Sequence, residues 1–182
     1  NVDLKAFTED FYFKLTGGHL QPVLDTLKYI RHETRTWLEI TTLLIPGRND
    51  SDEEITRLSR WIFRELGDDV PLHFSAFHPD YKMADVPPTP PETLVRARKI
   101  AHAAGLKHVY SGNVHNVEGD TTHCSSCHSK LIVRDWYEIL EYHLKEDGTC
   151  PQCGTPLAGR FEKYTGQFGR QRIPVSIHRE KM

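Results

Sequence analysis

The sequence predicts an α/β protein with a parallel sheet, followed by a small metal-binding module. Two observations support this prediction. Apolar, β-branched runs alternate with helical patterns in units of about 35 residues, and such strand–helix–strand units form parallel sheets with right-handed crossovers. All four cysteines follow these units, as two Cys-x-x-Cys pairs with residues 128–149 between them.

The first half of the pattern contains two strands and two helices. Strands are expected over residues 2–7 and 36–45, and the second is a near-continuous apolar run, typical of a strand buried on both faces. Residues 20–30 have apolar side chains at helical spacing, with Pro22 in the first turn. Ser51 to Glu54 form a capping box, which predicts a second helix that ends at Gly67.

The pattern then repeats, with a strand over residues 71–77, a helix over residues 94–104 and a strand over residues 107–111. Three or four such units are too few to close an eight-stranded barrel. Ligands of parallel sheets bind at the carboxyl ends of the strands, so polar residues at those ends are the candidates for function.

Asp3 and Lys5 are the first candidates, because residues two apart on a strand point to the same face of the sheet. An acid and a base in an apolar strand are costly unless they are paired or bound to a ligand. An exposed strand edge is the alternative explanation. His78 directly follows the third strand and suits ligand contact, with an ordinary loop histidine as its alternative. Asn113 and His115 follow the last strand in the same way.

The cysteines form two pairs on tight turns: Cys124, Cys127, Cys150 and Cys153. Four thiolates in this arrangement are the ligand set of a structural zinc site. Because thiolate spacing alone does not determine the metal, a four-thiolate iron site is an alternative. Cys124 to His128 also matches the pattern that attaches a c-type haem, but haem would leave the second pair unexplained.

Composition predicts a soluble, cytoplasmic protein. Of the 182 residues, 38% are hydrophobic and 26% are charged, and no apolar run approaches the roughly 18 residues that a membrane span needs. The net charge of −2 gives no general attraction to nucleic acid or to an anionic membrane, so neither is an expected partner. Cysteines that are grouped for a metal favour a reducing compartment.

The order of these segments resembles the radical SAM enzymes. The resemblance rests on residues 1–7, on the strand from Trp37 to Gly47 and on residues 74–80, and it is strongest to the branch of glycyl-radical (pyruvate formate-lyase) activating enzymes. With residues 109–113 and the two cysteine pairs added, the chain is most similar to the radical SAM member of the AmmeMemoRadiSam system, up to about residue 161.

This resemblance implies a fold and a chemistry. Residues 1–116 would be the C-terminal half of a partial (β/α)6 TIM-type barrel, residues 117–161 a zinc-ribbon-like module with a structural zinc, and residues 162–182 a basic tail. In the family, a reduced [4Fe-4S] cluster cleaves S-adenosylmethionine (SAM), and the resulting 5′-deoxyadenosyl radical abstracts a hydrogen atom. The substrate here is unknown, and a protein is one candidate.

The resemblance also implies which residues contact SAM. Asp3 would lie near a monovalent cation beside SAM, and Lys5 near the SAM carboxylate. His78 matches a histidine that contacts SAM, while Thr41 and Leu43 would line the barrel beside it. A bound zwitterion would give Lys5 and Asp3 the charge partners that an apolar strand does not provide.

The chain departs from the family pattern in two ways. The family's Cys-x3-Cys-x2-Cys cluster loop and its strand for the SAM amino group are absent from this sequence. We therefore expect the C-terminal part of a longer oxidoreductase-type enzyme, inactive by itself, with the cluster ligands outside this chain. Thr41 also stands where the activating enzymes have an arginine, which argues against a glycyl-radical protein as substrate.

A non-enzymatic module, in which a zinc ribbon on a small α/β domain binds a protein, is the alternative function. Residues 112–182 contain nine Lys and Arg and nine Asp and Glu, and this neutral balance disfavours nucleic acid. Between the cysteine pairs, five residues at helical spacing predict a helix that packs on the ribbon: Trp136, Ile139, Leu140, His143 and Leu144.

Overall fold

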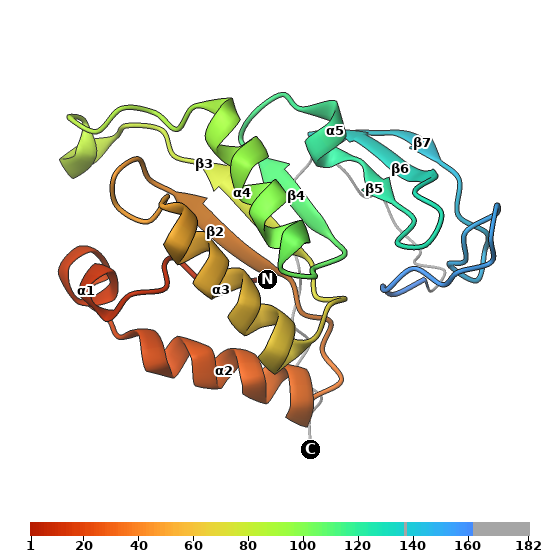
Figure 1. The fold of residues 1–182 in the computed structure, drawn as a ribbon, viewed down its shortest axis with the longest axis horizontal. Coiled ribbons are helices and arrows are strands. Elements are labelled where there is room, and N and C mark those ends of the chain that lie inside the picture. The colour runs from red at the N-terminus through yellow and green to blue at the C-terminus, as the bar shows by residue number, and fades with distance from the viewer. Residues whose placement is uncertain (137, 162–182) are drawn as a thin grey trace, which may run out of the picture.

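The protein consists of a parallel sheet covered by helices and a smaller antiparallel sheet beyond its last strand (Figure 1). The computed structural model describes residues 1–136 and 138–161. The basic tail that we expect over residues 162–182 lies outside the described residues. No helix in the described ranges is long and apolar enough to cross a bilayer.

The parallel sheet has four strands in the order β1-β2-β3-β4. They are β1 (Val2–Asp3), β2 (Ile40–Leu44), β3 (Leu72–Ala76) and β4 (Val109–Gly112). Each strand pairs in parallel with its neighbour in sequence, as consecutive strands of a (β/α) barrel do. The mixed α/β fold with a parallel sheet is therefore confirmed.

Three helices lie on one face of this sheet: α2 (Leu20–Glu33), α3 (Asp52–Leu66) and α4 (Pro91–Ala103). Ser51 caps α3, because its hydroxyl accepts a hydrogen bond from the Glu54 amide at 3.2 Å. The second half of the predicted capping box, in which the Glu54 carboxylate accepts a hydrogen bond from the Ser51 amide, is wrong. The Glu54 carboxylate instead accepts a hydrogen bond from the Phe7 amide at 2.7 Å, so it ties the segment after β1 to α3.

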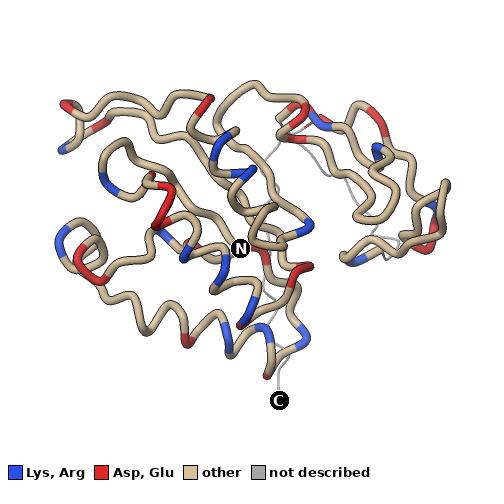
Figure 2. Tube along the Cα trace, viewed as in Figure 1, with Lys and Arg blue, Asp and Glu red and all other residues tan. Residues whose placement is uncertain are grey.

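Burial alternates along the strands, so the prediction that β2 is buried on both faces is wrong. Ile40 and Leu44 point under the helices, where they join the core around Phe74, and Thr42 between them is also buried. Thr41 and Leu43 point to the opposite face and are only half-buried. Lys and Arg positions mix with Asp and Glu positions along the helices (Figure 2). The helices cover one face of the sheet, and we call the opposite face the open face.

Two short helical segments follow β1 and were not predicted: α1 (Glu9–Phe11) and a π-helical turn at Tyr12–Thr16. A 3-10 turn (Tyr81–Met83) lies in the loop after β3. The Tyr12 hydroxyl accepts a hydrogen bond from the Lys5 amide at 3.0 Å. The segment after β1 is therefore held against the end of that strand.

The C-terminal module contains α5 (Val117–Asp120), β5 (Thr122–His123), β6 (Lys130–Asp135) and β7 (Glu138–Tyr142). The predicted helix between the cysteine pairs is wrong, because β7 pairs antiparallel with β6 there. All five residues of β7 are exposed. The helical spacing of Ile139 and Leu140 therefore did not reflect a buried face, and backbone pairing with β6 determined the structure.

Candidate functional site

The carboxyl end of β1 brings together the first two predicted site residues. The Lys5 ammonium lies 2.9 Å from the Asp3 carboxylate, and both side chains are partly exposed. The register aligns Asp3 with Thr41 on β2. Asp3, Lys5, Thr41 and Leu43 therefore lie on the open face, as alternation along neighbouring strands requires.

A buried asparagine, Asn49, organises this end of the sheet, and sequence analysis did not single it out. The Asn49 amide group donates hydrogen bonds to the carbonyls of Lys5 at 2.6 Å and Leu43 at 2.9 Å, and its oxygen accepts one from the Ile45 amide at 2.7 Å. Asn49 thus joins the ends of β1 and β2. The sequence offered no signal for this bridge beyond a polar residue shortly after a buried strand.

His78 is exposed just beyond β3, at the same carboxyl edge. The preceding residue, Phe77, donates a backbone hydrogen bond to the Thr89 hydroxyl at 3.0 Å, and that hydroxyl donates to the Leu44 carbonyl at 2.6 Å. The proline-rich loop after β3 is therefore anchored to the ends of two strands. This anchoring fixes the backbone from which His78 projects.

The open face also has a polar cluster that sequence analysis missed. The Glu39 carboxylate accepts hydrogen bonds from the His73 ring at 2.9 Å and the Trp37 indole at 2.9 Å. These donors, His73 first, lower the pKa of Glu39 to about 2. The His73 ring stacks on Tyr110 with 5.1 Å between centroids. Period-two alternation around β2 and β3 was the available signal for this cluster.

The four cysteines converge, as predicted. Their Sγ atoms all lie within 4.8 Å of one another, with Cys124 and Cys150 buried and Cys127 and Cys153 exposed. A tetrahedral zinc with Zn–S bonds of about 2.3 Å would hold its sulfurs about 3.8 Å apart, so the cluster has the right size for one ion. The geometry supports a four-cysteine metal site and does not distinguish zinc from iron.

Each cysteine pair lies on the same kind of turn. The His128 amide donates to the Cys124 carbonyl at 3.0 Å, and the Gly154 amide donates to the Cys150 carbonyl at 2.9 Å. His128 and Gly154 both have positive φ, 59° and 74°. His128 therefore occupies the left-handed position that glycine fills in the second pair, and its ring is not one of the grouped ligands.

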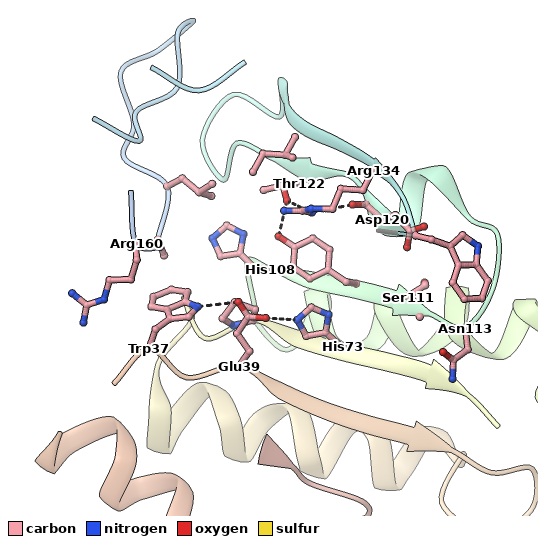
Figure 3. A pocket seen from close by; sticks show the side chains of 18 of the residues that line it. Trp37, Glu39, His73, His108, Ser111, Asn113, Asp120, Thr122, Arg134 and Arg160 are labelled. Carbon is pink, nitrogen blue, oxygen red and sulfur yellow. Dashed lines mark hydrogen bonds and ion pairs between the residues drawn. The ribbon is translucent and has the colours of Figure 1, made fainter. Parts of the chain in front are cut away.

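Hydrogen bonds connect this module to the parallel sheet (Figure 3). The Tyr110 hydroxyl on β4 lies 3.0 Å from the Thr122 hydroxyl on β5. Arg134 on β6 donates to the Thr122 hydroxyl at 2.9 Å and to the Asp120 carbonyl at 3.1 Å. The Arg134 guanidinium also lies over the Tyr110 ring, 5.7 Å from its centroid.

Comparisons with known proteins give similarities in sequence and in structure. No protein-family model matches the sequence. The uncharacterized protein MJ0808 of Methanocaldococcus jannaschii is 43% identical over 158 residues, which are 86% of this chain and 47% of that protein. The chain thus spans about half the length of this relative.

The second similarity is structural. A domain of a pyruvate-formate lyase-activating enzyme from Bacteroides vulgatus superposes with a TM-score of 0.53 at 15% sequence identity, over 62% of this chain and 66% of that domain's chain. At this identity the likeness is one of fold. The protein therefore has an α/β fold like that of this pyruvate-formate lyase-activating enzyme domain, with a four-cysteine cluster that could bind a metal.

Proposed function

We propose that this chain is the SAM-contacting, C-terminal part of a radical SAM enzyme of the AmmeMemoRadiSam type. Three observations support the proposal: the fold likeness to an activating-enzyme domain, the order of the sequence segments, and a relative about twice as long as the chain. The remaining strands of the barrel and the ligands of the [4Fe-4S] cluster would belong to sequence outside these 182 residues. The chain alone would then be inactive.

The Asp3–Lys5 pair on the open face is the observation that most supports SAM binding. SAM presents a carboxylate and an ammonium group, and the pair offers one complementary charge for each. Lys5 would leave Asp3 to meet the carboxylate, and Asp3 would then face the amino group or a monovalent cation. Thr41 and Leu43 would flank the ligand, and His78 would contact it from the carboxyl edge.

With a reduced [4Fe-4S] cluster bound, the chemistry available to the site is reductive cleavage of SAM and hydrogen abstraction by the 5′-deoxyadenosyl radical. The role of this chain in that reaction would be to bind and orient SAM. Asn49 would support SAM binding indirectly, because its hydrogen bonds hold the backbone of Lys5 and of Leu43 in place.

The four cysteines would hold a structural zinc. All four coordination positions of a tetrahedral ion would be filled by thiolates, which leaves no open position for a substrate or water. Thiols kept reduced for a metal also favour the cytoplasm as the location of the protein.

SAM binding tests the proposal directly. In equilibrium dialysis with labelled SAM, the Lys5→Met variant of the full-length protein should bind SAM at least tenfold more weakly than the unsubstituted protein. The matched control is Lys14→Met, because Lys14 forms a similar ion pair with Asp10 on an exposed helical turn. Equal SAM affinity in the two variants would refute the proposed site.

The same measurement distinguishes the enzyme from the non-enzymatic alternative. A zinc-stapled interaction module predicts no saturable SAM binding by the unsubstituted protein. A Cys-x3-Cys-x2-Cys loop encoded upstream of Asn1 would support the enzyme, and a start codon just upstream would refute it.

A further inference from the structure

A pocket of about 640 Å³ lies between the open face of the parallel sheet and the C-terminal module (Figure 3). Glu39, His73 and Tyr110 line it from the sheet, and Asp120 and Arg134 line it from the module. We call it the module pocket. Its volume falls in the range of pockets that bind small molecules, about 300–1,000 Å³.

The lining of the module pocket is rich in aromatic rings, from both the sheet side and the module side: Trp37, Tyr110, Trp136 and Phe161. Several rings are held in place by polar partners. The Trp37 indole donates to Glu39, and the Trp136 indole donates to His115 at 3.0 Å. Preformed aromatic surfaces of this kind bind planar groups and stack with cations.

The cationic side chains of the pocket are already engaged. Arg134 donates to the Asp120 carbonyl and the Thr122 hydroxyl, and Arg160 donates to the Arg35 carbonyl. Figure 3 shows the Arg160 guanidinium turned away from the other labelled side chains. An anionic ligand would therefore have to compete with these bonds.

The acidic side chains offer more to a ligand. Within the described residues, the Asp120 carboxylate accepts no hydrogen bond and forms no ion pair, although the side chain is only partly exposed. Burial, followed by the charge of Asp135, raises the pKa of Asp120. The charges of Arg134, Arg98 and His115 act in the opposite direction, and an N–H donor or a cation from a ligand would add to them. Glu39, at the other side of the pocket, has acceptor lone pairs beyond the bonds from His73 and Trp37.

We infer that the module pocket binds a small aromatic or heteroaromatic molecule that has a basic or N–H donor group, with the ring between the aromatic side chains and the donor group on Asp120. Aromatic walls select a planar body, and carboxylates with unfilled acceptor positions select a donor. The module would thus contribute one wall of a binding site, in addition to holding its own metal.

The pocket also reaches the edge at which we propose SAM to bind. Gly112 and Asn113 line one end of it, and the Asn113 side chain donates to the Ala76 carbonyl at 3.1 Å, two residues before His78. A molecule in the pocket would therefore lie along β4 with one end toward the carboxyl edge. That this molecule is the substrate of the enzyme would rest on the proposed function, whereas its binding to the pocket does not.

Fluorine NMR of 5-fluorotryptophan-labelled protein tests the inference. The chain has three tryptophans; two line the pocket, and Trp61 lies in the core under the helices. Benzamidine should shift the Trp37 and Trp136 signals in a saturable way and leave Trp61 unchanged. Benzoate, which has the same ring and the opposite charge, should bind at least tenfold more weakly.

The Asp120→Asn variant assigns the site. It should weaken benzamidine binding about tenfold, as expected for the loss of one charge-assisted hydrogen bond. Asp25→Asn, on the exposed side of α2, should leave it unchanged. Equal shifts of all three tryptophans, benzoate binding as tightly as benzamidine, or full affinity in Asp120→Asn would each overturn the inference.

Two further observations keep the outcome clear. If Asp120→Asn changes the Trp61 signal and so disturbs the fold, Trp136→Phe should weaken benzamidine binding in its place, and full affinity in that variant would overturn the inference. SAM titrated into the same sample tests the proposed function separately, because loss of SAM binding with benzamidine binding intact would refute only the radical SAM proposal.

Discussion

The Lys5 ammonium pairs with the Asp3 carboxylate at 2.9 Å on the open face, the face of the parallel sheet that no helix of the described residues covers. Register extends this position across the sheet, because Asp3 aligns with Thr41, Thr41 with His73, and His73 with Tyr110. One row of side chains therefore runs from the proposed SAM contacts to the module pocket.

The Asp3–Lys5 pair should matter little for stability. An exposed ion pair contributes about 0–1 kcal/mol, and both side chains here are more than one-third exposed. Lys5→Met should therefore change the free energy of unfolding by less than about 1 kcal/mol in urea denaturation, while it reduces SAM affinity. A large loss of stability would indicate a structural role instead.

Asn49→Ala should destabilise the protein strongly. The substitution removes three hydrogen bonds at a buried position and leaves backbone groups of two strand ends unsatisfied, at a cost of about 2–4 kcal/mol. Urea unfolding measures the change, with Gln21→Ala on the exposed surface of α2 as the control. An effect as small as that of the control would contradict the bridging role.

Glu39 should make stability depend on pH at the acidic end. Its pKa falls to about 2 in the folded protein, so its contribution is complete above the ordinary carboxyl value near 4.5 and is lost as pH decreases toward 2. Because the side chain is 37% exposed, we expect a contribution of about 1 kcal/mol rather than the full value of the shift.

Unfolding by urea at pH 6, 4 and 3 measures this contribution. Glu39→Gln should lose stability at pH 6 and should show a flatter pH dependence than the unsubstituted protein. Glu146→Gln, at an exposed position in the module, should keep the steeper profile. Parallel profiles for the two variants would exclude Glu39 as the source.

The four-cysteine cluster should bind about one zinc per chain. Elemental analysis should find that zinc lost in a double Cys124→Ser and Cys153→Ser variant and retained in Ser125→Ala. Removal of zinc should increase amide exchange in β5 and β6 more than in the parallel sheet, because the metal would join the two turns of the module. Iron with visible charge-transfer absorption would contradict the zinc assignment.

Paired substitutions test the strand that replaces the predicted helix. Leu140→Ala should cost less than about 0.5 kcal/mol, because β7 is exposed along its length. Leu131→Ala should cost about 2–5 kcal/mol, because Leu131 is 1% exposed in the core of the module. Similar costs at the two positions would indicate that residues 138–142 are buried in solution.

Most of the α/β fold could be predicted from local patterns. The α3 boundaries followed from Ser51 and Gly67, and the strands followed from short apolar runs. Features that depend on neighbours distant in sequence could not be predicted. Glu54 binds the Phe7 amide rather than completing its capping box, and residues 138–142 pair with β6 although their apolar spacing is helical.

The sequence by itself determined the order of strands and helices, the shared face of Asp3 and Lys5, and the pairing of the four cysteines on two turns, because each depends on periodicity or on spacing along the chain. Only the tertiary structure decided that the helices of the described residues cover one face of the sheet, that Asn49 joins two strand ends, and that β4 and the module enclose a pocket. These features require residues from separate elements to meet. Their positions depend on packing and strand register, which no local pattern specifies.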